Sequence, residues 1–153
     1  MEERIRKRKI VLVGTGFVGM SFAYSLLSEK GINELVLIDM NKDKAVGEQM
    51  DLSDGLPYAD SKMTIKAGEY EECGDADIVV ITAGAAQKPG QTRLELVGIN
   101  ARITKDVATQ VKNSGFKGIL VVASNPVDIM TYVAYKASGL PKEHVIGSGT
   151  ILD

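Results

Sequence analysis

A glycine-rich turn near the start of the chain constrains the fold more than any other feature. The apolar run Lys9–Val13 leads into three glycines, Gly14, Gly16 and Gly19, in the spacing G-x-G-x-x-G, and a helix-like segment spans Val18–Lys30. In such a turn the first glycine permits a sharp exit from a strand, and the second lets backbone N–H groups approach a phosphate. The third glycine lets the helix pack closely on the strand. The pattern predicts a strand, a phosphate-binding turn and a helix.

An acidic residue closes the next apolar run. The run Leu35–Ile38 ends at Asp39, about 20 residues beyond the last glycine, where a carboxylate meets the ribose of a bound dinucleotide. Such a carboxylate accepts hydrogen bonds from the ribose hydroxyls of NAD and repels the extra phosphate of NADP. A glycine-rich turn alone needs no ligand, but a strand, helix, strand and acid in register predict NAD as cofactor.

The rest of the chain alternates between strand-like and helix-like runs. Strands are expected at Lys9–Val13, Glu34–Ile38, Met63–Ala67, Asp77–Thr82, Gly118–Ala123 and His144–Gly147. Helices are expected at Val18–Lys30, Lys42–Asp54, Leu94–Ser114 and Val127–Ser138, with Gly31, Gly115 and Gly139 at helix ends. Nearly continuous aliphatic strands are typical of parallel sheets covered on both faces. We predict an α/β fold, a doubly wound parallel sheet of six strands between helices, forming one Rossmann domain over residues 1–153.

Composition excludes several classes of protein. A net charge of −2 argues against a nucleic-acid or membrane-surface partner, and no apolar run is long enough to span a membrane. The single cysteine, Cys73, allows no internal disulfide, is consistent with a reducing compartment such as the cytoplasm, and is expected to be structural.

Two groups of charged residues have a plain interpretation. The basic cluster from Arg4 to Lys9 could be a targeting or phosphate-contacting arm, but we favour a solvated lead-in to the first strand. The acidic pairs Glu71–Glu72 and Asp75–Asp77 lack histidine or cysteine partners at ligand spacing, so no metal site is expected.

Three further segments resemble the lactate/malate dehydrogenase family, in particular its bacterial L-lactate dehydrogenases. They are Thr82–Arg93 (TAGAAQKPGQTR), Ser124–Asp128 (SNPVD) and Gly147–Asp153 (GSGTILD), and the likeness covers essentially the whole chain in order. In that family an NAD-binding half precedes a substrate-binding half of similar length. The resemblance implies that this chain corresponds to the first half, with the catalytic domain absent from it.

The resemblance also implies which residues hold the cofactor. They are Gly14, Gly16, Phe17, Val18, Gly19, Asp39, Lys44, Tyr70, Thr82, Ala83, Gly84, Ala123, Ser124, Asn125 and Ser148. Two of these segments have simpler readings that stay open: small residues at 83–84 also suit a bare turn, and Asn-Pro at 125–126 is a common helix-starting turn.

The substrate side of the site is implied by the segment Gln87–Arg93, which resembles the family's loop that closes over the substrate. By resemblance Arg93 is catalytic and polarises the 2-keto oxygen. Without the family motif, Arg93 would be interpreted as a solvated charge at the start of a helix. An arginine in place of Gln87 would pair with the second carboxylate of oxaloacetate, so the neutral glutamine favours pyruvate. Gln91 departs from the family's usual glutamate. Asn125 is implied to help position the substrate.

Asp153 matches the family's aspartate that orients the catalytic histidine, and so is expected to be catalytic and substrate-binding. The one histidine, His144, precedes the family's catalytic position and is expected to have a surface or capping role. The resemblance also implies the activity. It implies a cytoplasmic, homo-oligomeric, NAD-dependent oxidoreductase of glycolysis and fermentation acting on pyruvate and L-lactate. The 153-residue chain alone is expected to be inactive because it lacks the family's catalytic histidine. The alternatives are a malate or other 2-hydroxy acid dehydrogenase and a non-catalytic NAD-binding module or assembly fragment.

Overall fold

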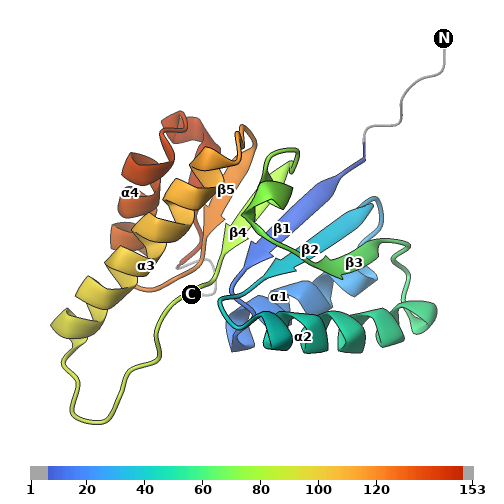
Figure 1. Ribbon diagram of the computed structural model, residues 1–153, viewed down its shortest axis with the longest axis horizontal. Helices are drawn as coiled ribbons and strands as arrows, with labels where there is room; N and C mark the ends of the chain where they lie inside the picture. The colour runs from blue at the N-terminus through green and yellow to red at the C-terminus, as the bar shows by residue number, and fades with distance from the viewer. Residues whose placement is uncertain (1–6, 150–153) are drawn as a thin grey trace.

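Six parallel strands form one sheet in the order β3-β2-β1-β4-β5-β6. The structure is a computed structural model that describes residues 7–149 (Figure 1). The strands are β1 Lys9–Val13, β2 Glu34–Ile38, β3 Thr64–Ala67, β4 Ile78–Ile81, β5 Ile119–Val122 and β6 Val145–Gly147. The chain builds outward from β1 to β3, returns to β4 on the other side of β1, and builds outward again to β6. The predicted doubly wound parallel sheet is confirmed.

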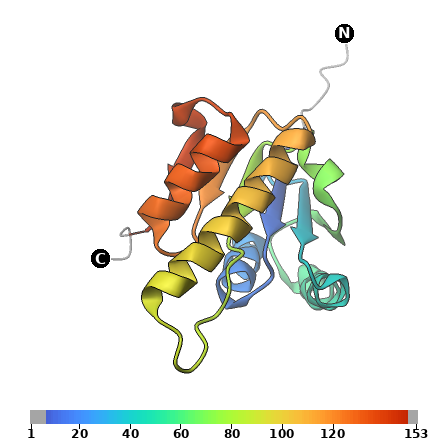
Figure 2. The same ribbon diagram turned by 60° about the vertical axis from the view of Figure 1, so that its left-hand side comes forward.

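Helices cover both faces of this sheet. They are α1 Phe17–Ser25, α2 Lys42–Gly55, α3 Arg93–Asn113 and α4 Val127–Ser138, with short 3-10 turns η1 Leu26–Ser28, η2 Leu56–Tyr58, η3 Tyr70–Cys73 and η4 Lys142–His144. Figures 1 and 2 show α1 and α2 on one face and α3 with α4 on the other. In β1, Val11 and Val13 join the core under α3 and α4, whereas Ile10 and Leu12 join the core under α1 and α2. Burial on both faces explains the continuous aliphatic runs in the sequence.

The predicted element boundaries differ from the structure by at most one residue at each end, except for the first helix. That α-helix ends at Ser25, and η1 continues only to Ser28 instead of Lys30. Gly31, with φ +89°, therefore shapes the following loop and does not cap a helix. Gly139 caps α4 in the left-handed conformation, and Gly115, with φ +84°, follows α3 as predicted.

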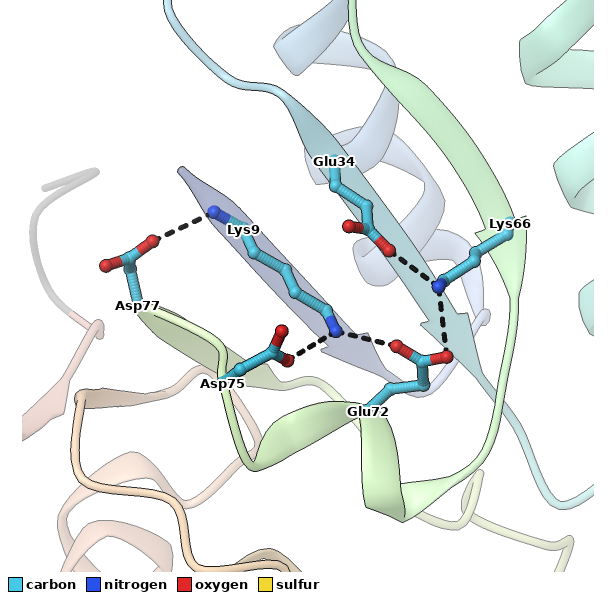
Figure 3. A network of polar contacts seen from close by, with 6 residues as sticks. All are labelled: Lys9, Glu34, Lys66, Glu72, Asp75 and Asp77. Carbon is cyan, nitrogen blue, oxygen red and sulfur yellow. Dashed lines mark hydrogen bonds and ion pairs between the residues drawn. The ribbon is translucent and has the colours of Figure 1, made fainter. Parts of the chain in front are cut away.

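The prediction of a solvated basic lead-in is wrong for Lys9. The residue is only 5% exposed, and its Nζ donates to Glu72 Oε2 and Asp75 Oδ1, at 2.6 Å each. Its backbone N–H donates to Asp77 Oδ2 (Figure 3). Burial disfavours the charged amine, but the hydrogen bonds to Asp75 and Glu72 outweigh it and raise the pKa of Lys9. Arg4 and Arg6 of the same cluster lie outside the described residues.

A second lysine extends these contacts. Lys66 Nζ lies 2.7 Å from Glu34 Oε1 and 3.0 Å from Glu72 Oε1, so Glu72 joins the two lysines (Figure 3). We call Lys9, Glu34, Lys66, Glu72, Asp75 and Asp77 the amino-edge network, because it lies around the start of β1, β2 and β4. Glu72, Asp75 and Asp77 belong to the two acidic pairs. Glu72 and Asp75 neutralise lysines, and Asp77 accepts the backbone N–H of Lys9.

Cys73 and His144 both lie away from the carboxyl ends of the strands. Cys73 is fully buried in the core, and burial raises the pKa of its thiol to about 12, which keeps it protonated. His144 Nδ1 lies 3.1 Å from the Gly118 carbonyl oxygen, just before β5 and β6 begin. This position suits the expected capping role.

Candidate functional site

The glycine turn joins β1 to α1 at the carboxyl edge of the sheet. Gly14 has φ +104°, and a Cβ there would lie 2.6 Å from the backbone nitrogen of Ala83. A Cβ at Gly19 would collide with the Gly14 carbonyl and the Thr82 hydroxyl, so only glycine lets α1 approach this closely. At Gly16 nothing lies within 4 Å of the Cβ position, so the turn is open to a ligand there. The first N–H groups of α1 have no acceptor within the helix and are suited to phosphate oxygens.

Asp39 follows β2 and is tied directly to this turn. Its Oδ2 accepts hydrogen bonds from both the backbone N–H and the hydroxyl of Thr15, at 2.8 Å each, and its Oδ1 accepts one from the Asn41 N–H at 2.9 Å. Burial works against the charged form, but these hydrogen bonds outweigh it and lower the pKa of Asp39. The carboxylate is therefore ionised at neutral pH and fixed beside the turn.

A cavity of about 690 Å³ extends from the turn between the strand ends and α3. Its volume is within the range of small-molecule sites. Eight of the predicted cofactor residues line it: Gly14, Gly16, Asp39, Lys44, Tyr70, Thr82, Ala83 and Gly84. Burial raises the pKa of the Tyr70 phenol to about 12, so it presents a neutral ring and hydroxyl. The structure thus gathers residues from β1, β2, β4 and their following loops where the strand order reverses, which is where open α/β sheets bind ligands.

Other predicted cofactor residues lie at the same edge but do not line the cavity. Phe17 and Val18 are exposed at the start of α1. The Ser124 hydroxyl donates to the Ala83 carbonyl at 2.7 Å, and the Ser148 N–H donates to the Val122 carbonyl at 2.8 Å. The remaining members of this group are Gly19, Ala123 and Asn125. For all seven residues, contact with a cofactor stays a prediction.

The predicted substrate loop projects away from the sheet between β4 and α3 (Figures 1 and 2). Gln87 Nε2 donates to the Gln91 carbonyl at 2.8 Å, and the Lys88 N–H donates to Gln91 Oε1 at 3.1 Å, so both glutamine side chains bond within the loop. Arg93 is the exposed first residue of α3, whose start is fixed by a capping box between Thr92 and Glu95. Neither Gln87 nor Arg93 lines the cavity. Asp153 lies outside the described residues.

Sequence reasoning missed Asn100, which joins the two loops that flank the site. Asn100 is 6% exposed; its Oδ1 accepts from the Ala85 N–H at 2.8 Å, and its Nδ2 donates to the Asn125 carbonyl at 3.3 Å. One buried amide therefore links the end of β4 to the end of β5. An isolated asparagine in a helix carries no motif, so nothing in the sequence marked it.

Sequence reasoning also missed the wall that α3 contributes to the cavity. Its lining residues are Arg102, Ile103, Asp106, Val107 and Gln110. The opposite rim carries Lys42, whose Nζ lies 2.5 Å from Glu69 Oε1. The spacing of four from Arg102 to Asp106 to Gln110 places these polar residues on one helix face. This spacing was the one sequence pattern that could have indicated a polar face on α3.

The described part of the chain contains neither a cluster of metal-binding side chains nor a membrane-spanning helix. Between residues 7 and 149, no group of three or more His, Cys, Asp or Glu side chains is placed to hold a metal ion. Within the same range, no helix has both the length and the apolar character needed to cross a membrane.

Comparison with known proteins adds independent findings. Residues 8–147 match the family described as lactate/malate dehydrogenase, NAD binding domain. An L-lactate dehydrogenase of Lactococcus lactis subsp. cremoris (strain NZ9000) is 57% identical over 150 residues, which are 98% of this chain and 48% of that protein. The chain thus spans about half the length of the curated relatives it matches.

Solved structures show the same similarity. The minor L-lactate dehydrogenase from Enterococcus mundtii, in its ligand-bound form, superposes with a TM-score of 0.92 at 55% identity, covering 96% of this chain and 47% of that one. The malate dehydrogenase from Aeropyrum pernix superposes with a TM-score of 0.86 at 40% identity, covering 94% of this chain and 46% of that one. The malate enzyme is thus similar in fold but more distant in sequence.

Proposed function

Because the chain belongs to the lactate/malate dehydrogenase family, as its NAD-binding domain, we propose that it forms the cofactor-binding half of an L-lactate dehydrogenase. That enzyme interconverts pyruvate and L-lactate. The identity of 57% to an L-lactate dehydrogenase, against 40% to a malate dehydrogenase, supports lactate over malate. We infer further that residues 1–153 are one Rossmann domain and that a separate domain supplies the remaining substrate contacts.

The observation that carries the proposal is the fixed position of Asp39 beside an open glycine turn. The turn offers N–H groups to the pyrophosphate, with open space at Gly16, and Asp39 offers its carboxylate to the ribose hydroxyls. The residues present therefore fit a dinucleotide. When bound, NAD carries the hydride between its nicotinamide ring and C2 of the substrate.

The remaining cavity residues have assignable tasks. Tyr70 and Lys44 line the same cavity as Asp39, and Thr82, Ala83 and Gly84 allow close approach to the backbone where β4 ends. The other implied cofactor contacts are proposed to come from Phe17, Val18, Gly19, Ala123, Ser124, Asn125 and Ser148 at the same edge of the sheet.

Substrate contacts are proposed for the loop and its neighbours. Closure of the loop brings Arg93 to the 2-keto oxygen, where its guanidinium stabilises developing negative charge. Gln87 faces the methyl end of pyruvate, where a neutral amide leaves a second carboxylate unpaired. Asn125 positions the substrate, and Asp153 orients the proton donor. The intact enzyme is proposed to be a cytoplasmic homo-oligomer of glycolysis and fermentation, with α2 and α3 as candidate subunit contacts.

The 153-residue chain by itself is proposed to bind NAD without turning over pyruvate. Its one histidine, His144, contacts the Gly118 carbonyl at the amino edge, away from the glycine turn, so it is badly placed to deliver a proton. A fluorescence titration with NADH tests the binding, and NADH oxidation with pyruvate tests the activity. We expect saturable binding and no turnover. Failure to bind NADH would overturn the cofactor site, and turnover at the rate of a complete dehydrogenase would overturn the argument about the histidine.

A further inference from the structure

Thr15 lies between the first two glycines of the turn and contacts Asp39 twice. The residue is 1% exposed, and both its backbone N–H and its hydroxyl donate to Asp39 Oδ2, at 2.8 Å each. Any residue other than proline could supply the N–H at this position, but among short side chains only serine and threonine add a hydroxyl. The second hydrogen bond is therefore a property of this side chain and not of glycine-rich turns in general.

The two donors of Thr15 occupy one oxygen of the Asp39 carboxylate. Each carboxylate oxygen accepts about two hydrogen bonds, so the capacity of Oδ2 is used by Thr15. Oδ1 accepts one hydrogen bond, from the Asn41 N–H, and no second donor to it occurs among residues 7–149. Because Asp39 also lines the cavity, the carboxylate commits Oδ2 to the protein and keeps part of Oδ1 for a ligand.

The Thr15 hydroxyl restricts rotation of the carboxylate. Rotation about the bond to the carboxyl carbon of an aspartate is otherwise broad, and Asp39 is only partly buried, next to the fully exposed Met40. Without the hydroxyl, two backbone N–H groups would hold the carboxylate, one on each oxygen. A carboxylate held more weakly can turn toward solvent when an anion approaches, because water then replaces its hydrogen bonds.

We propose that Thr15 is a positioning residue that strengthens the rejection of NADP by holding the Asp39 carboxylate in place. The inference rests on the proposed binding of NAD at this turn, and it adds a second residue to the selectivity expected from Asp39. Repulsion of a 2′-phosphate is large only if the carboxylate cannot move away, and moving away would break the hydrogen bond from the Thr15 hydroxyl. NAD has a hydroxyl at the 2′ position and requires no such movement, so the restraint penalises NADP alone.

The test measures the dissociation constants of this chain for NAD and NADP by isothermal titration calorimetry. Thr15→Val keeps the shape of the side chain and removes the hydroxyl. Its preference for NAD over NADP should fall about fivefold, the size of one hydrogen bond, while its affinity for NAD should change by less than about twofold. Thr15→Ser retains the hydroxyl and should keep the preference of the unmodified chain. Thr64→Val, at the exposed threonine that begins β3, is the matched control and should keep it too.

A double-mutant cycle tests whether Thr15 acts through Asp39. In a chain that already carries Asp39→Ser, adding Thr15→Val should leave the ratio of the two affinities unchanged, because the charge that Thr15 holds is gone. If circular dichroism shows that Thr15→Val does not fold, Thr15→Ala removes the same hydroxyl with fewer atoms and is measured in its place.

The outcomes distinguish this inference from the proposed function. An unchanged preference in Thr15→Val, or an equal loss of affinity for NAD and NADP, would overturn the positioning role and leave Thr15 as a structural part of the turn. A fall in preference that persists in the Asp39→Ser background, or that also occurs in Thr64→Val, would overturn it as well. A failure of the unmodified chain to bind either cofactor would instead overturn the proposed cofactor site.

Discussion

At the amino edge of the sheet, a nearly buried lysine is neutralised by carboxylates, whereas at the carboxyl edge a carboxylate is held by a hydroxyl and backbone N–H groups beside a cavity. Lys9, nearly buried, is shared by Glu72 and Asp75 in the amino-edge network (Figure 3). At the carboxyl edge Asp39 is held by Thr15 and Asn41, with no ion pair in the described part of the chain. The sheet thus has a charge network that stabilises the fold at its amino edge and, in Asp39, a carboxylate suited to a ligand at its carboxyl edge.

One short connection serves both edges. Between β3 and β4 the chain passes through η3, where Tyr70 lines the cavity, and then reaches Glu72 and Asp75, which neutralise Lys9. The comparison predicts that substitutions at the carboxyl edge change ligand preference and that substitutions at the amino edge change stability.

The largest effect is expected from Gln87→Arg in the complete parent enzyme. The new guanidinium gains a partner in the second carboxylate of oxaloacetate and is desolvated without a partner over pyruvate. The ratio of kcat/KM for oxaloacetate to that for pyruvate should rise on the order of 10²-fold. Steady-state kinetics with both substrates checks this. Because the loop is exposed, the midpoint of thermal unfolding should stay unchanged; an unmoved substrate ratio would show that position 87 does not meet the substrate.

At the amino edge, Lys9→Met should lower the free energy of unfolding by about 2 kcal/mol. The methionine keeps the apolar stem but leaves Asp75 without this cation and Glu72 with Lys66 alone. Partial solvent exposure of both carboxylates keeps the loss below that of a fully buried pair. Urea unfolding followed by circular dichroism measures it. Lys117→Met, at an exposed lysine, is the matched control. The affinity of the folded variant for NADH should change by less than about twofold; a larger change would mean that the two edges are coupled through η3.

Smaller effects, on both cofactor preference and stability, are expected from substitutions at Asp39. Asp39→Ser removes the charge that opposes a 2′-phosphate, so the preference for NAD over NADP should fall about tenfold. It also removes the acceptor of the buried Thr15 N–H and should cost about 1 kcal/mol of stability. Asp39→Asn retains an acceptor oxygen. It should therefore lose the preference for NAD over NADP but keep the free energy of unfolding of the unmodified chain. Calorimetric titration with NAD and NADP, beside urea unfolding, separates the two roles, and equal affinity for both cofactors in the unmodified chain contradicts the first.

The smallest effect concerns pH. Hydrogen bonds from Lys9 lower the pKa of both Glu72 and Asp75. Carboxyl groups with a lowered folded-state pKa contribute stability that is present above their ordinary pKa near 4 and is lost as the pH falls through the folded values. Between pH 5 and pH 3 the unmodified chain should therefore lose up to about 1 kcal/mol more stability than Lys9→Met, in which both pKa values return toward normal. Identical acid sensitivity of the two proteins in urea titrations would contradict this coupling.

The sheet could be predicted accurately from the sequence because strands buried on both faces are apolar at nearly every position. Strands such as β1 and β4 are unbroken aliphatic runs, and the glycines at 14 and 19 are required by close approach of backbone atoms. The turn and Asp39 could therefore be identified before the structure was known, whereas the other cavity residues among the predicted cofactor contacts were named through the family resemblance. The turn and Asp39 depend on local spacing, which a sequence displays directly.

What the sequence could not predict depends on contacts between distant residues. Lys9 looked like the end of a basic run, but its environment is set by Glu72 and Asp75, more than sixty residues later. Asn100 likewise has no local pattern; its role comes from Ala85 and Asn125, which only the fold brings beside it. Helix periodicity could have grouped Arg102 with Asp106, yet it does not say which helix face meets the cavity.

The two fixed ends of the loop between β4 and α3 set the entropic cost of closing it. Asn100 holds the N–H of Ala85 at one end, and the capping box of Thr92 and Glu95 holds the other. Only residues 86–91 between these anchors need lose backbone freedom when the loop closes, at about 1–2 kcal/mol for each residue ordered. The turn between Lys88 and Gln91 already restricts part of that segment. On the proposed closure, a loop anchored in this way orders fewer residues than a free loop would, which reduces the free energy that the few contacts of a small substrate would have to supply.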